Sequence, residues 1–408
     1  MADLKSPDRR RFLHSGAASG AIAGLAPGLL AAATDGADNR VRAYRTLGRT
    51  GLDISDISFG SSRLRAGQED LVQFALDRGI NYFDSAYGYT GGASEQVLGK
   101  VLKGLRQEVV LVSKVENTAD WPASRMMAQL EASLKRLRTD YIDIYMAHAV
   151  NDVERLQSPE WHAFIERAKA DGKIRFTGMS GHAGQLVDCL DYALDQDMVD
   201  VILCAYNFGQ DPAFYERFTR SFNFVANQPD LPRVLAKAKA RNVGVVVMKT
   251  LMGARLNDLR DYETPNGTFS QAAFRWVLSN PNVDALVISM TSKADIDEYL
   301  GASGAAALAA GDLELLQRYA ALNGMTYCRH ACDDCAGACP YGVQISDVLR
   351  TRMYATDYED FAFASDEYAM IDTNAAVCLS CSGEPCRNAC THGLPIAQMC
   401  APTHRMLA

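Results

Sequence analysis

The sequence has no excess of basic residues and, beyond its N-terminus, no long apolar run. It contains 41 Lys and Arg residues against 49 Asp and Glu residues, which gives a net charge of −8. A general nucleic-acid-binding surface needs clustered positive charge, so this composition argues against nucleic acid as a partner. No window of roughly 20 strongly apolar residues, the length needed to span a bilayer, follows the first 33 positions. A protein with several membrane spans is therefore excluded.

Cysteine is scarce over most of the chain and concentrated near its end. Only Cys189 and Cys204 precede Cys328, whereas eight of the eleven cysteines lie between Cys328 and Cys390. The 408 residues are 48% hydrophobic and 22% charged, a composition that supports a folded core. A chain of this length predicts one large domain with a small one, or two to three domains. The clustered cysteines indicate that the small domain is C-terminal.

The N-terminal segment has the pattern of an export signal. Residues 8–14 read Asp-Arg-Arg-Arg-Phe-Leu-His, and an Ala-, Gly- and Leu-rich stretch follows over 17–33. This arrangement resembles the bacterial twin-arginine signal. The resemblance implies a signal peptide over 1–33, recognised by the twin-arginine translocation machinery, and a linker over 34–43. The expected location is periplasmic or otherwise exported. A flexible basic tail and an uncleaved membrane tether are the alternatives.

The middle of the chain alternates short apolar runs with segments of helical spacing. The runs lie at 54–59, 81–83, 109–112, 141–145, 174–176, 199–202, 243–247 and 285–288. Alternation of this kind predicts βαβ units and a parallel sheet, and eight units match the size of a (β/α)8 barrel. We expect this barrel to occupy 44–323. An open doubly wound sheet is the rival fold, but the segment Phe59-Gly60-Ser61-Ser62 lacks the glycine-rich phosphate turn that such a sheet favours.

Three chemically active side chains follow three consecutive runs. Asp84, Lys114 and His148 stand where these runs end, and in a barrel such ends share one mouth. Asp84 could pair with Lys114 simply to stabilise the barrel end. Tyr89, in the loop after Asp84, favours a catalytic role over a purely structural one. A nearby ammonium group is expected to lower the pKa of a phenol. Such a phenol could protonate a carbonyl oxygen as a general acid while His148 orients the substrate.

Several motifs in this region resemble the aldo-keto reductase family. They include Gly79-Ile80-Asn81-Tyr82-Phe83-Asp84-Ser85-Ala86, Val112-Ser113-Lys114, Asp140-Tyr141-Ile142-Asp143-Ile144-Tyr145 and Gly178-Met179-Ser180. The likeness extends over about residues 44–302 and implies a TIM barrel with NAD(P)-dependent carbonyl reduction or alcohol oxidation. Carried over to this sequence, the catalytic tetrad is Asp84, Tyr89, Lys114 and His148.

The same resemblance implies a set of cofactor-binding positions. These are Ser180, Met248, Lys249, Thr250, Leu251, Gly253, Ser289, Thr291 and Ser292. The segment from Ser289 would face the 2′-phosphate of NADP, and it contains Asp295 about where family members often have Arg. An acid there would repel a phosphate, which favours NAD over NADP.

The clustered cysteines form two runs with regular spacing. One consists of Cys328, Cys332, Cys335 and Cys339, followed by Pro340, and the other of Cys378, Cys381, Cys386 and Cys390. These runs resemble bacterial two-cluster ferredoxins, in which three cysteines of one run and the last of the other hold each cluster. The resemblance implies a ferredoxin-like domain over 324–408 with one or two 4Fe-4S clusters. Disulfides and zinc sites are the alternatives.

Two functions fit these features. The first is an exported iron–sulfur aldo-keto reductase that acts on a carbonyl or alcohol substrate and has a possible redox partner protein. The second is an electron carrier built on a barrel with little nicotinamide-dependent catalysis. Departures from the family's usual cofactor-binding residues, such as Asp295, favour it. A disulfide-stapled binding module is a third, weaker interpretation.

Overall fold

A computed structural model describes residues 39–209, 228, 230–251, 259–264, 267–323, 328, 332 and 334–408. The predicted signal peptide over 1–33, the first half of the predicted linker and Gly253 lie outside these ranges. Residues Asn39–Ala408 form one compact unit. No helix among the described residues has the length and apolar character needed to cross a membrane.

Eight parallel strands close into a barrel at the centre of the molecule, in the order β10-β3-β4-β5-β6-β7-β8-β9. Their bounds are β3 Ile57–Gly60, β4 Tyr82–Asp84, β5 Val110–Val115, β6 Ile142–Ala147, β7 Ile174–Gly181, β8 Val201–Ala205, β9 Gly244–Met248 and β10 Ala285–Ser289. Closure comes from β10, which pairs with both β3 and β9. The predicted (β/α)8 barrel is therefore confirmed, and the open doubly wound sheet is wrong.

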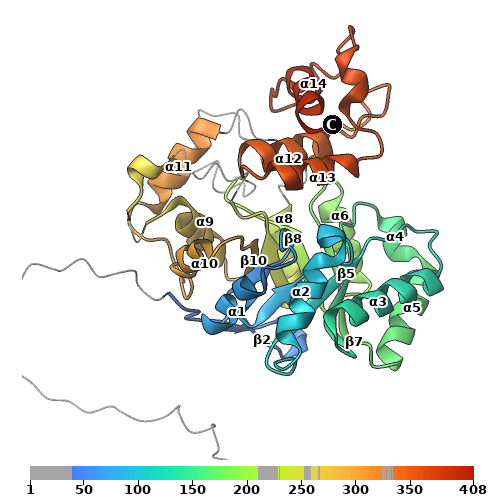
Figure 1. Ribbon diagram of the computed structural model, residues 1–408, viewed down its shortest axis with the longest axis vertical. Helices are drawn as coiled ribbons and strands as arrows, with labels where there is room; N and C mark the ends of the chain where they lie inside the picture. The colour runs from blue at the N-terminus through green and yellow to red at the C-terminus, as the bar shows by residue number, and fades with distance from the viewer. Residues whose placement is uncertain are drawn as a thin grey trace, which may run out of the picture. The chain divides into compact units, whose positions relative to one another are not determined.

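Helices that follow the strands in the chain cover the outside of the barrel (Figure 1). They are α1 Glu69–Asp77, α2 Ala93–Leu102, α3 Ala123–Leu137, α4 Val153–Gln157, α5 Pro159–Ala170, α6 Leu186–Asp195, α8 Leu231–Ala240, α9 Phe269–Leu278 and α10 Lys293–Leu300. Helix α3 shows why these segments fold in this way. Its apolar residues Met126, Leu130, Leu134 and Leu137 recur at helical spacing and are buried, while the opposite face is polar. Burial of such faces against the strands forms the larger core of the protein.

A two-stranded hairpin closes the N-terminal end of the barrel. It consists of β1 Tyr44–Thr46 and β2 Asp53–Ser55, joined through the turn η1 Gly48–Thr50. Leu47 and Ile54 from this hairpin join the apolar core inside the barrel, which includes Tyr82, Val112 and Val246. Because these side chains fill the N-terminal end of the barrel, a ligand enters at the C-terminal end of the strands. The predicted first run at 54–59 is thus divided between the hairpin and β3.

The cysteine-rich segment forms a small helical unit with its own core. Helix α11 Asp312–Asn323 leads into it, and α12 Ile345–Thr356, α13 Phe361–Ala369, η4 Ala375–Leu379 and α14 Ile396–Leu407 follow. Val348, Ala364, Tyr368, Ile396 and Leu407 pack together at its centre, with six of the clustered cysteines against them. A barrel followed by a small cysteine-bearing unit is thus confirmed, whereas the domain boundaries at 43/44 and 323/324 stay predictions.

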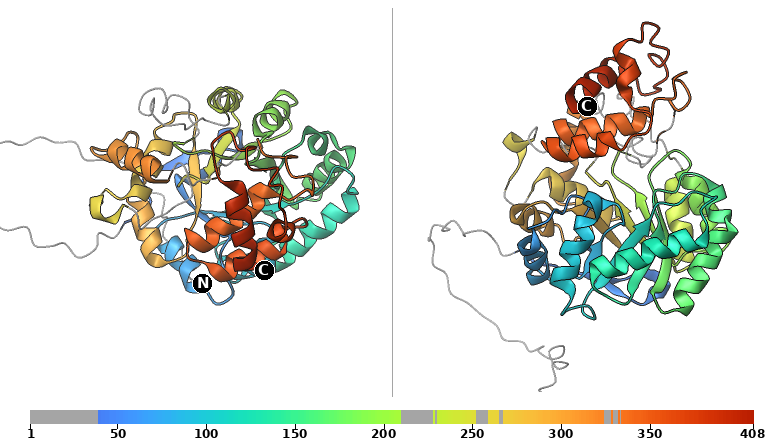
Figure 2. Two further views of the ribbon diagram at one scale, coloured as in Figure 1. Left: turned by 90° about the horizontal axis from the view of Figure 1, so that it is seen from above. Right: turned by 45° about the vertical axis from the view of Figure 1, so that its right-hand side comes forward.

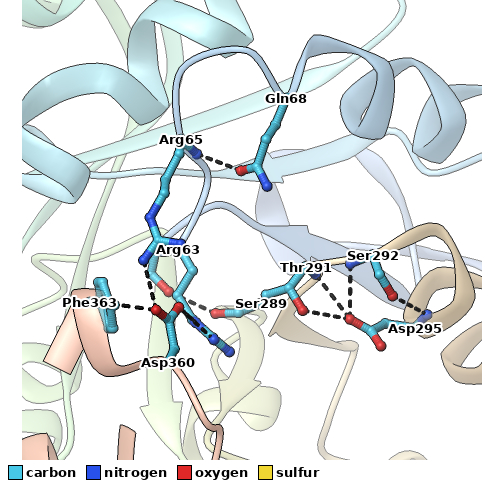
Figure 3. Close-up of polar contacts among 10 residues, drawn as sticks. Arg63, Arg65, Gln68, Ser289, Thr291, Ser292, Asp295, Asp360 and Phe363 are labelled. Atoms are coloured by element: carbon cyan, nitrogen blue, oxygen red, sulfur yellow. Dashed lines mark hydrogen bonds and ion pairs between the residues drawn. The ribbon is translucent and has the colours of Figure 1, made fainter. Parts of the chain in front are cut away.

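An ion-pair clamp ties this helical unit to the barrel. The Asp360 carboxylate, just before α13, accepts hydrogen bonds from Arg63 at 2.7 Å and Arg65 at 2.8 Å, both in the loop after β3 (Figure 3). The Arg63 guanidinium also lies 5.3 Å from the centre of the Tyr358 ring. Figure 2 shows α12 and α13, in orange-red, lying across the barrel. The helical unit is therefore held over the C-terminal ends of the strands.

Candidate functional site

Lys114 and Asp84 form a buried ion pair at the mouth of the barrel. Asp84 ends β4 and Lys114 lies near the end of β5, and parallel pairing brings these strands side by side. The Lys114 ammonium donates to Asp84 Oδ1 at 2.6 Å and to the Ser85 carbonyl at 2.7 Å. Burial lowers the pKa of Lys114 and raises the pKa of Asp84, and their mutual attraction opposes both changes. Two hydrogen bonds thus fix the ammonium group in place.

His148 lies next to this pair and stays neutral. It directly follows β6, and its backbone N–H donates to the Val115 carbonyl at 2.8 Å. Burial and the nearby charges of Lys114, Arg155 and Lys249 lower the pKa of its imidazole to about 3. A neutral imidazole can donate a hydrogen bond to a substrate oxygen without carrying charge itself.

Tyr89 completes the tetrad that the sequence predicts. It begins the short turn η2 Tyr89–Gly92, and its ring centre lies 5.2 Å from Lys114 Nζ and 5.6 Å from the centre of the His148 ring. The structure brings all four residues together.

The predicted direction of the Tyr89 pKa shift is wrong. Desolvation is the largest effect and raises the pKa of the phenol well above its ordinary value, and the acidic groups Asp84, Glu367 and Glu116 raise it further. Lys114 is close, but removal of water outweighs its charge. Tyr89 therefore remains protonated at neutral pH, which still suits a proton donor, because an alkoxide is a far stronger base than a phenolate.

A cavity of about 1450 Å³ surrounds the tetrad. Ligand pockets in proteins usually measure about 300–1,000 Å³, so this one has room for a dinucleotide and a second small molecule. All four tetrad residues line it, as do Arg350 and Tyr354 of α12 and Glu367 of α13. The helical unit therefore forms one wall of the same cavity.

Most of the predicted cofactor positions face this cavity. Among the described residues, the wall includes Ser180, Met248, Lys249, Leu251, Ser289 and Thr291, but not Thr250 or Ser292. Ser180 Oγ accepts a hydrogen bond from the Ala149 N–H at 3.0 Å. Lys249 has a φ of 58°, an uncommon conformation for a residue other than glycine. Burial lowers the pKa of its ammonium group to about 7.

Asp295 occupies the N-terminus of α10 with its own carboxylate. Its Oδ2 accepts hydrogen bonds from Thr291 Oγ1 at 2.6 Å and from the Ser292 N–H at 2.9 Å (Figure 3). Ser292 caps the helix in return, because its hydroxyl accepts from the Asp295 N–H. The Thr291 hydroxyl and the Ser292 N–H, two donors that could bind an anion at this helix start, are thus already engaged by an internal carboxylate.

The eight clustered cysteines fall into two groups in space. Cys328 is influenced electrostatically by Cys332, Cys335 and Cys390, and burial with these neighbours raises the pKa of its thiol to about 12. Cys378 is influenced in the same way by Cys339, Cys381 and Cys386. Each group combines three cysteines of one run with the last cysteine of the other. All eleven cysteines, each of them described, are free thiols in the structure.

Cys400, for which the sequence suggested no role, lies buried in α14 near cysteines of both groups. It is influenced by Cys378 and Cys386 of one group and by Cys328 and Cys335 of the other. Cys332 also forms a compact set with Asp334 and His392, whose ligand atoms lie within 4.8 Å of one another.

Comparison with known proteins agrees with this geometry. The sequence profile of the Aldo/keto reductase family matches residues 57–269. L-galactose dehydrogenase of Arabidopsis thaliana is 26% identical over 63% of this chain and 87% of its own, and methylglyoxal reductase YeaE of Escherichia coli is 31% identical over 58% and 76%. A solved aldo-keto reductase from Pseudomonas aeruginosa is 28% identical, covers 66% of this chain and 97% of its own, and superposes with a TM-score of 0.51.

The fold and the site together define an oxidoreductase barrel. The chain belongs to the aldo/keto reductase family, and it is an enzyme of that oxidoreductase class. The solved relative covers about two thirds of this chain, so roughly a third of the sequence has no counterpart there.

The sequence reasoning missed the cavity residues that come from the C-terminal unit. Arg350, Tyr354 and Glu367 lie far from the tetrad in sequence, and no motif marks them as part of a site. The sequence does offer one signal in this region, a combination of acidic and aromatic residues at 354–368.

Proposed function

We propose that this protein is a nicotinamide-dependent reductase of aldehydes or ketones, which also catalyses the reverse alcohol oxidation. The observation that supports this most is the joint placement of Asp84, Tyr89, Lys114 and His148 around one cavity. The names of two relatives, a dehydrogenase and a methylglyoxal reductase, point to the same reaction class.

The cavity fits a nicotinamide dinucleotide. Its volume exceeds what a small carbonyl compound needs, and its wall includes Ser180, Lys249 and Ser289. Ser180 would hold the carboxamide, and the Lys249 ammonium would lie near the phosphates. When bound, the nicotinamide supplies or accepts the hydride.

Side chains of the protein carry out the proton transfer. The Tyr89 hydroxyl donates its proton to the carbonyl oxygen as hydride reaches the carbonyl carbon, which leaves an alcohol. The Lys114 ammonium, held by Asp84, stabilises the negative charge that then develops on the Tyr89 oxygen. The neutral His148 imidazole orients the same substrate oxygen by a hydrogen bond. In the reverse direction the phenolate takes the proton back.

We propose NAD as the cofactor in preference to NADP. The Asp295 carboxylate already accepts the hydrogen bonds at the start of α10. Asp295 and Glu298 also act electrostatically on Tyr299, which lines the cavity, so acidic charge gathers at this end of it. A 2′-phosphate placed there would meet repulsion instead of N–H donors.

The two groups of cysteines support a further proposal, that each binds a 4Fe-4S cluster. A 4Fe-4S cluster needs four thiolate ligands, and each group has four cysteines. As in two-cluster ferredoxins, each group contains three cysteines of one run and the last cysteine of the other. Cys332 and Cys335 line the main cavity, so the group around Cys328 is the nearer one to the tetrad. The clusters would exchange single electrons with a redox partner protein.

The N-terminal arginines support the proposal that the protein is exported through the twin-arginine route. That route transports folded proteins, so clusters could be inserted before export. The expected destination is the periplasm or an equivalent compartment.

The second candidate function is electron transfer by a barrel that does not catalyse carbonyl reduction. The cysteine group around Cys328, of which Cys332 and Cys335 line the cavity, favours it. Anaerobically purified protein should be mixed with NADH and then with methylglyoxal, while the absorbance of NADH is followed. Consumption that the variant Tyr89→Phe lowers by about 10²-fold or more, with NADH binding retained, supports the reductase. Binding without turnover supports the carrier.

A further inference from the structure

The cysteine-rich unit contributes side chains to the pocket around Tyr89. We propose that Arg350, Tyr354 and Glu367 contact the substrate, and that this substrate carries hydroxyl groups next to its carbonyl carbon. This inference rests on the proposed reductase function and assigns to the C-terminal unit a part in substrate specificity.

The first step is that Tyr354 and Glu367 lie near Tyr89 of the tetrad, with Arg350 close to Glu367. Tyr89 is influenced electrostatically by both Tyr354 and Glu367, although more than 260 residues of sequence separate them. All of these side chains line one cavity with Lys114 and His148. A substrate whose oxygen meets Tyr89 therefore has α12 and α13 on its other side.

The second step is that positively and negatively charged side chains lie close together in this part of the cavity. Lys249 of the barrel is influenced by Arg350 and Glu367, and Glu367 in turn by Arg350 and Glu116. Cations and carboxylates thus stand as close neighbours from both the barrel and the helical unit. On α12 itself, Arg350 Nη1 pairs with Asp347 Oδ1 at 3.1 Å, so cationic and acidic groups are matched around the side chains of the helical unit.

The third step is what such a pocket recognises. A hydroxyl group donates to a carboxylate and accepts from an ammonium or guanidinium group, and it satisfies both kinds of neighbour at once. An unsubstituted aliphatic aldehyde offers neither a donor to the Glu367 carboxylate nor an acceptor to the Arg350 guanidinium once water is displaced, which is costly. The geometry therefore favours a hydroxylated carbonyl compound.

The fourth step is that the unit is held firmly enough to define a pocket. Asp360 accepts from Arg63 and Arg65 and also caps α13 through the Phe363 N–H at 3.2 Å (Figure 3). Tyr354 and Tyr358 pack against the core that the barrel helices form. Asp360 is thus a positioning residue, because it acts through the helix that carries Glu367.

The test compares two aldehydes of similar size in the full-length, anaerobically purified protein. DL-glyceraldehyde carries hydroxyl groups and butanal carries none, and NADH consumption is measured with each. The variants are Glu367→Gln and Arg350→Gln. Their matched controls are Asp366→Asn and Arg352→Gln, which change charge on the same helices at positions that do not line the cavity. The variant Tyr354→Phe removes only a hydroxyl and serves if a charge change prevents folding.

We expect wild-type protein to prefer glyceraldehyde. Each pocket variant should raise the KM for glyceraldehyde about tenfold or more, as loss of a charged hydrogen bond predicts, with a much smaller effect on kcat and on butanal. The control variants should behave as wild type. If wild type reduces both aldehydes and the pocket variants match their controls, the inference is wrong while the reductase function stands. If wild type reduces methylglyoxal but neither of these aldehydes, the inference is wrong and the reductase function stands. If it reduces none of the three, the reductase function is wrong, and the inference falls with it.

Discussion

Lys114 Nζ lies 2.6 Å from Asp84 Oδ1, and the two residues come from adjacent strands of the barrel. Both side chains are almost fully buried, with exposed fractions of 1% and 6%. A buried ion pair stabilises a protein only weakly, because desolvation offsets the attraction. Because the Lys114–Asp84 pair lies beside Tyr89, we assign it a catalytic role: it holds a positive charge where the Tyr89 phenolate forms.

Replacing Lys114 tests whether its charge stabilises the Tyr89 phenolate. The variant Lys114→Met should lower kcat/KM for carbonyl reduction by about 10²–10⁴-fold, because the developing charge on Tyr89 loses its counter-ion. Initial rates of NADH consumption provide the measurement. Lys100→Met is a matched control, since Lys100 pairs with Glu69 on the surface. An active Lys114→Met variant would contradict the role assigned to this charge.

Replacing Asp295 tests the cofactor preference. The variant Asp295→Asn removes the negative charge at the start of α10 but keeps an oxygen that can accept the same hydrogen bonds. We expect the dissociation constant of NADPH to fall about tenfold while that of NADH changes little, because one close repulsion disappears. Quenching of tryptophan fluorescence measures both constants. Asp297→Asn, which alters charge on the same helix near Arg78, should leave the preference unchanged.

The pKa of Lys249, lowered to about 7, predicts that nucleotide binding depends on pH. Below pH 7 the side chain is an ammonium ion and attracts phosphate, and above pH 7 it is neutral. The affinity for NAD+ should therefore fall as the pH rises from 6 to 8.5. Titration calorimetry across this range measures it, and Lys249→Met should bind weakly at every pH with a flat profile. His148, with a pKa of about 3, should add no step in this range.

The grouping of cysteines predicts how iron content responds to substitution. Cys328→Ser should remove one cluster, and Cys378→Ser should remove the other, because the two residues belong to different groups. Each single variant should retain about half of the wild-type iron and sulfide, and the double variant almost none. Cys204→Ser, buried in β8, is the control and should keep the full amount. Zinc or disulfides in place of clusters would show as protein without acid-labile sulfide.

Much of the barrel could be predicted from the sequence because its signals are local. Apolar runs such as 243–247 and 285–288 fall on β9 and β10, since a strand buried on both faces needs a continuous apolar stretch. Asp84, Lys114 and His148 could be assigned to one site for a related reason. Parallel strands end at the same edge, so residues at their ends meet whatever their separation in sequence.

Two features depended on the tertiary structure alone. The direction of the Tyr89 pKa shift depends on how much water the surrounding chain removes, and no sequence spacing reports desolvation. The contribution of Arg350, Tyr354 and Glu367 depends on how α12 and α13 pack across the barrel, through a clamp between Asp360 and residues almost 300 positions earlier. Local patterns determine which elements form and which residues end them. Only the packing of distant elements decides which side chains share a cavity, because that depends on the sum of many weak contacts between them.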